Sequence, residues 1–155
     1  MEFRLAVSAD APAIASALRD ILEIHHNGRP DLFREGATKY DEKAVADMIA
    51  EGKDMVFVAA CGITVCAYAI CRIEQVSGNP IRRDVKTMYL DDLCVMPEYR
   101  DRGIGHRFMD MLFDEAKKRG CDNFELNVWE FNSRAIAFYE SCGLTVQRRR
   151  MEKCL

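Results

Sequence analysis

Two adjacent carboxylates mark the place in this 155-residue chain where chemistry is expected. Asp91 and Asp92 interrupt the otherwise apolar run 88–95, in which a half-buried strand would alternate apolar and polar residues. A conflict of this kind between a residue and its predicted element often marks a functional site. A carboxylate in such a strand can hold a cationic group and help to remove its proton.

The segment after this strand combines arginines and glycines in a pattern suited to anion binding. Residues 98–105 lead into a predicted helix, and the first N–H groups of a helix have no partner within it. The aligned peptide dipoles also place about half a positive charge at that end. Gly103 and Gly105 lack a Cβ, so their backbone can approach a phosphate, while Arg100 and Arg102 add charge. The alternative is a glycine-assisted turn with solvated arginines.

Two separated motifs in the second half of the chain carry a family resemblance. The first joins Leu93-Cys94-Val95, Pro97-Glu98-Tyr99-Arg100 and Arg100-x-x-Gly103-x-Gly105. The second is Asn132-x-x-Ala135-x-x-Phe138-Tyr139-Glu140-x-x-Gly143-Leu144. Together they resemble the GNAT superfamily of acetyl-CoA-dependent N-acetyltransferases, and the stretch YLDDLCVMPEYR is most similar to polyamine and thialysine acetyltransferases.

The resemblance implies that acetyl-CoA is the co-substrate and that its pantetheine arm lies between two strands that splay apart beside Asp91 and Asp92. The N–H of Leu93 would polarise the thioester oxygen, Val95 would hydrogen-bond the pantetheine, and the amides of residues 102–105 would hold the pyrophosphate. The full set implied for cofactor binding is Leu93, Cys94, Val95, Arg100, Asp101, Arg102, Gly103, Ile104, Gly105, Asn132, Ala135 and Tyr139.

Direct acetyl transfer to an amine requires two proton transfers. An alkylamine has a pKa of about 10, so a carboxylate must hold the cation and help to remove its proton. Asp91 is the first choice for this role, with Glu74 and Asp92 as alternatives. The departing thiolate gains from a proton donor, and the resemblance gives that role to Tyr139. Composition alone would make Tyr139 a core residue of its helix.

The acceptor is expected to bind beside an irregular segment, residues 25–40. Residues 25–40 are interrupted by glycine and proline and carry Phe33 among charged residues. In the superfamily the corresponding region usually closes over the acceptor, so Phe33, Asp91 and Asp92 are the predicted acceptor-binding residues. The alternative is that Phe33 packs into the core. Loop composition does not encode the ligand, which leaves a small-molecule amine, a protein N-terminus or lysine, and a non-catalytic acyl-CoA sensor open.

Composition limits the class of protein. A chain of this length fits one domain, residues 1–155, and its net charge of −3 without a basic stripe argues against nucleic acid. An acidic mouth could instead attract a cationic amine. No apolar run approaches the ~20 residues that cross a bilayer, and no signal-peptide core is present, so a cytoplasmic protein without membrane contact is predicted.

The cysteines and histidines predict no metal site. Seven cysteines occur without a Cys-x-x-Cys pair or a histidine at zinc spacing, which indicates reduced, structural thiols. Cys94 could instead be a nucleophile, but no activating partner lies near it in the sequence. His25 and His26 are neighbours and cannot share a helical face as metal ligands, so exposed or capping roles are expected.

The order of elements predicts an α/β layout with a mixed sheet and helices on both faces. The resemblance to GNAT proteins implies that this sheet is mostly antiparallel and twisted, with splayed central strands. Asp10 is expected to cap the first helix, and the segment 148–155 could be an edge strand that pairs with a second subunit in a homodimer. In the first half, the predicted elements are strand 2–8, helix 10–28, helix 41–51 and a hairpin of strands 55–61 and 64–76. The central strand is predicted over 83–96, with Glu74 of the hairpin opposite residues 89–92. After it come a helix following the glycine loop, strand 123–129 parallel to 83–96, a helix from Asn132 or Ser133 to Gly143, and strands over 144–155.

Overall fold

A five-stranded sheet forms the centre of the molecule, and the computed structural model describes residues 1–155 throughout. The strands lie in the order β1-β2-β3-β4-β5, and every neighbouring pair is antiparallel except β4 and β5. Their bounds are β1 (Glu2–Leu5), β2 (Met55–Cys61), β3 (Thr64–Val76), β4 (Val85–Val95) and β5 (Asn123–Leu126). The predicted mixed, mostly antiparallel sheet and the parallel relation of its last pair are therefore confirmed.

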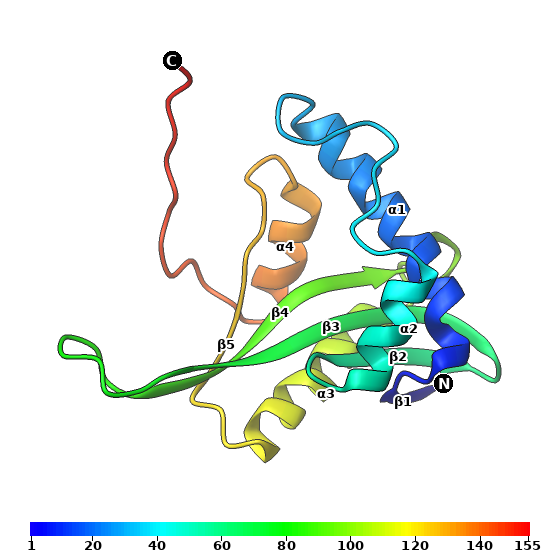
Figure 1. Ribbon diagram of the computed structural model, residues 1–155, viewed down its shortest axis with the longest axis horizontal. Coiled ribbons are helices and arrows are strands. Elements are labelled where there is room, and N and C mark those ends of the chain that lie inside the picture. Colours follow the sequence, from blue (N-terminus) through cyan, green and yellow to red (C-terminus); the bar gives the residue numbers. More distant parts are fainter.

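Helices cover both faces of this sheet, as predicted (Figure 1). On one face, α1 (Ala11–Gly28) and α2 (Glu42–Glu51) bury Leu18 and Val45 against Tyr68 of β3. On the other face, α3 (Ile104–Lys118) buries Phe108 against Met88 of β4, and α4 (Ser133–Ser141) packs beside it. The sheet therefore separates two apolar cores. None of the helices has the length and apolar character needed to span a membrane.

The ends of α1 and α2 differ in how well local sequence explains them. Asp41 caps α2 by accepting a hydrogen bond from the Ala44 N–H, and Gly52 ends it with φ of 64°. The capping role expected of Asp10 at α1 is wrong, because its carboxylate makes no cap hydrogen bond to that helix. It accepts instead from the Val7 N–H at 2.8 Å and pairs with Arg4. β1 consequently stops at Leu5, and a 3-10 turn (η1, Ser8–Asp10) precedes α1.

One extra residue in β4 disturbs the pairing of the central strands. The register runs from Ala67 opposite Val95 to Val76 opposite Val85, but it shifts where Ile70 faces Asp92 and Cys71 faces Leu90. Asp91 is therefore the unpaired residue of a β-bulge.

Pairing on the other side of β4 is short. β5 pairs with it only from Thr87–Asn123 to Leu90–Leu126, so the predicted strand 123–129 ends at Leu126. Residues 91–95 of β4 thus have no neighbour on the β5 side, and the expected splaying of these strands is confirmed.

The strands predicted for residues 144–155 are wrong. This segment contains no regular element, is largely exposed, and extends away from the sheet (Figure 1). Three polar contacts connect it to the body: the Leu144 N–H donates to the Tyr139 carbonyl at 3.1 Å, the Gln147 amide donates to Glu125 at 3.0 Å, and Glu152 pairs with Arg29. An alternating sequence alone does not make a strand without a partner. The edge strand expected to form a homodimer contact is therefore absent from this chain, and the homodimer itself stays a prediction.

The Arg4–Asp10 pair predicts a pH-dependent contribution to stability. Its hydrogen bond to Arg4 lowers the pKa of Asp10 below the ordinary value of 3.8 despite burial. The stabilisation is therefore complete above that value and is lost as the pH falls through the lowered pKa. We expect Asp10→Asn to reduce the free energy of unfolding at pH 7 by about 1.5–3 kcal/mol, and by less in acid.

Urea unfolding between pH 3 and pH 7 measures this difference. Asp114→Asn is the matched control, because the Asp114–Lys117 pair is exposed and its loss should cost less than about 0.5 kcal/mol. An equal effect of the two substitutions would contradict the role given to Asp10.

Candidate active site

The backbone of β4 beyond Leu90 presents hydrogen-bonding groups toward the gap left by β5. The Met96 N–H donates to the Cys66 carbonyl at 2.9 Å, which fixes the phase of the antiparallel ladder with β3. Because successive residues of such a ladder point their backbone groups in opposite directions, those of Leu93 and Val95 are directed away from β3. The Leu93 N–H and the Val95 backbone, to which the family resemblance gives the thioester and the pantetheine, therefore face the opening.

One group at this edge already has a partner within the chain. The Val95 carbonyl accepts a hydrogen bond from Nε of Arg100 at 2.9 Å. Arg100 thus holds the loop after β4 against the strand, a contact that the sequence did not predict. The N–H of Val95 remains the group directed at the opening.

The loop between β4 and α3 reverses the chain through two residues in the left-handed region. Asp101 has φ of 59° and Gly103 has φ of 70°. α3 then begins without a side-chain cap and without an acidic residue in its first turn. The first N–H groups of this 15-residue helix are therefore not used by side chains, which is the condition for binding an anion there. Arg102 lies over the Tyr99 ring beside this loop, at 5.6 Å from its centroid.

Gly105 also has a packing role that the sequence did not predict. A Cβ on Gly105 would lie 3.0 Å from Cε2 and 3.1 Å from Cζ of Phe138, and 3.7 Å from Cγ2 of Val95. The missing side chain therefore lets α4 pack closely on the start of α3, next to the open edge of β4. Gly103 has no atom within 4 Å of the equivalent position and is required for its backbone angle alone.

α4 brings the second motif to the same place. Asn132 caps this helix, as predicted, by accepting from the Ala135 N–H at 3.1 Å. Tyr139 packs against the α3-side core, and burial, together with the nearby Asp92 carboxylate, raises the pKa of its phenol well above 10.0. Tyr139 is therefore neutral near pH 7 and can act as a proton donor.

The two adjacent carboxylates lie on the α1 side of the sheet and are paired with two cations. Lys39, from the loop between α1 and α2, places its Nζ 2.5 Å from Asp91 Oδ2 and 2.8 Å from Asp92 Oδ2. Arg72 of β3 contacts the other oxygen of Asp91 at 3.2 Å. Burial raises the pKa of Asp92 above 3.8 even though Lys39 opposes the shift, so this carboxyl holds a proton more readily than an exposed aspartate.

Glu74 lies outside this cluster, and its expected position opposite residues 89–92 is wrong. The register of β3 and β4 places it opposite Thr87. Its side chain is 48% exposed and contacts the cluster only through Arg72, whose Nε donates to it at 2.9 Å. The bulge at Asp91 moves the partner of Glu74 by one position only, from Met88 to Thr87, so the expected position fails through the register of the whole ladder, which sequence does not reveal.

An aromatic cluster beside the carboxylates was not predicted. His25 of α1 lies 5.1 Å from Phe33, Phe33 lies 5.4 Å from Trp129, and Trp129 stacks on Phe131 at 6.0 Å between ring centroids. Phe33 joins neither apolar core, so its predicted alternative as a core residue is wrong. His25 is half-buried, and burial lowers its pKa below 6.5, where an exposed or capping residue was expected. The ring of Phe131 occupies the space a Cβ on Gly28 would need.

The cysteines are all free, in agreement with the expected reduced state. Cys94 is buried in the α1-side core, and burial raises the pKa of its thiol. A neutral, buried thiol is a poor nucleophile, which disfavours an acetyl-cysteine intermediate at this position. The structure groups no three His, Cys, Asp or Glu side chains in a way that could hold a metal ion.

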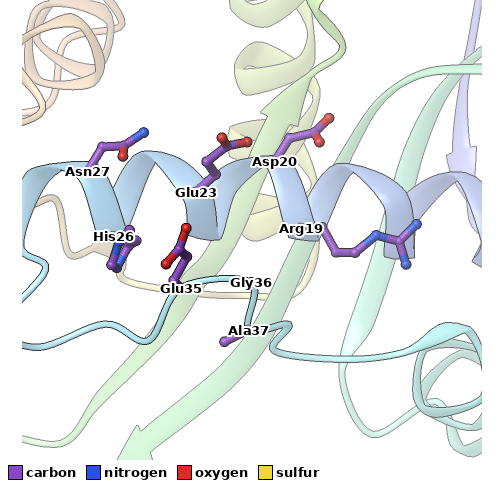
Figure 2. Close-up of a pocket in the computed structure, with 8 residues that line it drawn as sticks. All are labelled: Arg19, Asp20, Glu23, His26, Asn27, Glu35, Gly36 and Ala37. Atoms are coloured by element: carbon purple, nitrogen blue, oxygen red, sulfur yellow. The ribbon is translucent and has the colours of Figure 1, made fainter.

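A separate polar hollow of about 400 Å³ lies between α1 and residues 35–37 (Figure 2). Three carboxylates, one arginine and one histidine are among its lining residues, and neither β4 nor α3 contributes to it. Residues 35–37 of its lining belong to the same segment between α1 and α2 as Lys39. It is lined by Arg19, Asp20, Glu23, His26, Asn27, Glu35, Gly36 and Ala37.

Residues 18–144 match the model of the family described as "Acetyltransferase (GNAT) family". The chain belongs to this family. Members use acetyl-CoA as co-substrate, and the open β4 edge and the uncapped start of α3 described above are contributed by the matched region.

Solved and curated relatives agree with this assignment. A mutant of the BH1408 protein from Bacillus halodurans has a TM-score of 0.94 to this GNAT protein at 30% identity, with 100% of this chain and 99% of that chain covered. Thialysine N-epsilon-acetyltransferase from Mus musculus is 36% identical over 58 residues, 37% of this chain and 34% of the relative. [Ribosomal protein bS18]-alanine N-acetyltransferase from Escherichia coli (strain K12) is 41% identical over 54 residues, 35% of this chain and 36% of the relative. The matched segments thus span about a third of these curated relatives.

The close approach of α4 to Gly105 predicts that Gly105→Ala is destabilising. The added methyl would force the Phe138 ring or α4 to move, at an expected cost of about 1–3 kcal/mol. Phe138→Leu removes the ring atoms that meet the methyl, so the double variant should lose less stability than the sum of the single variants. Thermal unfolding of the four proteins measures this coupling, and strictly additive losses would contradict the contact.

Proposed function

We propose that this GNAT protein transfers the acetyl group of acetyl-CoA directly to a primary amine of a small molecule. The observation that carries the proposal is that β4 has no partner on the β5 side after Leu90. The backbone groups of Leu93 and Val95 face the resulting opening, which begins next to the uncapped N-terminus of α3. An extended pantetheine arm can add to such an edge as a strand would, while the diphosphate lies on the helix N-terminus.

The chemistry follows from the positions of three groups. The N–H of Leu93 would stabilise the oxyanion that forms when the amine attacks the thioester carbonyl. Asp92, whose burial raises the pKa of its carboxyl and so makes the carboxylate a stronger base than an exposed aspartate, would take the proton from the acceptor ammonium, with Asp91 holding the cation beside it. Tyr139, kept neutral by burial, would donate a proton to the departing thiolate of coenzyme A.

Two features favour a small cationic acceptor. The carboxylates already hold one alkylammonium group, that of Lys39, so their arrangement suits a primary amine. The hollow beside α1 carries Asp20, Glu23 and Glu35, so its negative potential would attract an amine toward the site. One curated relative is named for acting on thialysine, a small molecule, which agrees with this class.

Acetylation of a protein N-terminus is the second candidate. It is favoured by the similarity to the alanine acetyltransferase of ribosomal protein bS18, which matches over 35% of the chain, close to the 37% matched by the thialysine acetyltransferase. An acceptor of this kind would need its backbone to enter between the aromatic cluster and the loop.

Calorimetric titration with acetyl-CoA, followed by thiol release across a panel of amines, tests the proposed function. We expect acetyl-CoA to bind and at least one small primary amine to be turned over faster than peptides that begin with alanine. Faster turnover of the peptides would favour the second candidate. Binding without turnover of any acceptor would contradict an enzyme and leave an acyl-CoA sensor.

Replacing Tyr139 tests the proposed proton donor. Because Tyr139→Phe removes only the hydroxyl, we expect turnover to fall by ~10²-fold while acetyl-CoA binding is retained. Phe138→Tyr, which adds a hydroxyl one residue earlier, should not restore the loss in the double variant. Unchanged turnover in Tyr139→Phe with normal binding would remove the tyrosine from the mechanism.

A further inference from the structure

Lys39 places a primary alkylammonium group on the carboxylates to which the acceptor amine is assigned above. Its Nζ lies 2.5 Å from Asp91 and 2.8 Å from Asp92, and its side chain is 35% exposed. The loop that carries it passes over the end of β4 in Figure 1. A lysine side chain is itself a primary amine on an unbranched alkyl chain, so this chain contains a group of the same chemical class as the proposed acceptor.

The position of Nζ relative to the reacting strand follows from covalent geometry. Asp92 directly precedes Leu93, and neighbouring Cα atoms are about 3.8 Å apart. An amine held on the Asp92 carboxylate is therefore close to the backbone that would hold the thioester. Because the lysine is attached to the protein, its local concentration is in the millimolar range or above, which favours it over dilute free amines.

We propose that Lys39 is a self-acetylation site and that the protein modifies it in cis when acetyl-CoA is bound without an acceptor. This rests on the proposed function, because the same residues perform the same transfer. Nζ loses a proton to Asp92 and attacks the carbonyl carbon, a C–N bond forms, and the C–S bond breaks. Tyr139 donates its proton to the departing coenzyme A thiolate and regains the second proton of the nitrogen, while Asp92 releases the first to solvent. The products are the lysine amide, the coenzyme A thiol and one free proton, and no electrons are exchanged.

Acetylation would change the charge of the site. The acetylated side chain is a neutral amide and no longer offers a cation to two carboxylates. Arg72 would then be the one cation still in contact with Asp91, and Asp92 would lose its partner. The acceptor site would gain negative charge, so a cationic acceptor would bind without displacing Lys39. The modification thus removes an internal competitor.

Lys43 provides the matched comparison in the same molecule. It lies four residues further on, in α2, where its Nζ pairs with Asp47 and its side chain is 83% exposed. Uncatalysed reaction with acetyl-CoA would modify the accessible amine of Lys43. The proposed transfer within the site selects Lys39 instead. The ratio of acetylation at the two lysines therefore separates catalysis in the site from surface chemistry.

Peptide mass spectrometry of the full chain, incubated with acetyl-CoA and no acceptor, tests the proposal. We expect acetylation of Lys39 at least about tenfold faster than that of Lys43, with a rate per molecule independent of protein concentration. Lys39→Arg should take up no acetyl group in the site, whereas Lys43→Arg should leave the rate at Lys39 unchanged. Equal rates at the two lysines, or a rate that rises with protein concentration, would overturn the proposal.

Kinetics test the consequence for the acceptor. Lys39→Gln, which resembles the acetylated side chain, should lower the KM for a cationic amine, and Lys39→Arg should not. An unchanged KM in Lys39→Gln would overturn the role of Lys39 as an internal competitor. If free amines are turned over while Lys39 stays unmodified, self-acetylation is refuted and the proposed acetyltransferase function stands. If acetyl-CoA binds but neither a free amine nor Lys39 is acetylated, both proposals are refuted.

Discussion

The extra residue at Asp91 is the constraint on which the geometry of this molecule depends. Side chains along a regular strand alternate between faces, so a single inserted residue reverses the alternation beyond it. Before the bulge, Met88 and Leu90 point into the α3-side core; after it, Cys94 and Met96 point into the α1-side core. The pair of aspartates lies where this reversal happens, which explains why the apolar pattern of the strand breaks there.

The same bulge connects the two halves of the proposed site. It coincides with the end of β5 pairing, because the four residues of β5 match only the part of β4 before Asp91. Beyond that point the strand offers backbone groups on one edge and carboxylates on one face. The backbone edge faces the loop and helix that suit a phosphate, and the carboxylates face α1 and the loop that carries Lys39. A strand paired with β5 along its whole length would leave no free backbone edge.

The parts of this arrangement that sequence predicts are those encoded locally. The loop from Arg100 to Gly105, the cap at Asn132 and the hairpin of β2 and β3 depend on residues a few positions apart, and all three are present. Contacts between distant segments were missed or misassigned. Lys39 meets Asp92 across 53 positions, and no local pattern marks an isolated loop lysine. The position of Glu74 depends on the register of two long strands, which sequence does not fix, and the alternation of residues 144–155 predicts a strand only if a partner exists.

Two separate cores also bear on how such a protein can change over time. The residues proposed to hold the nucleotide end of acetyl-CoA are supported by the core under α3 and α4, whereas α1 and its following loop rest on the other core. Substitutions that reshape the loop around Lys39 would leave the packing beneath α3 intact. Acceptor specificity could therefore change through substitutions in this loop while acetyl-CoA binding is retained.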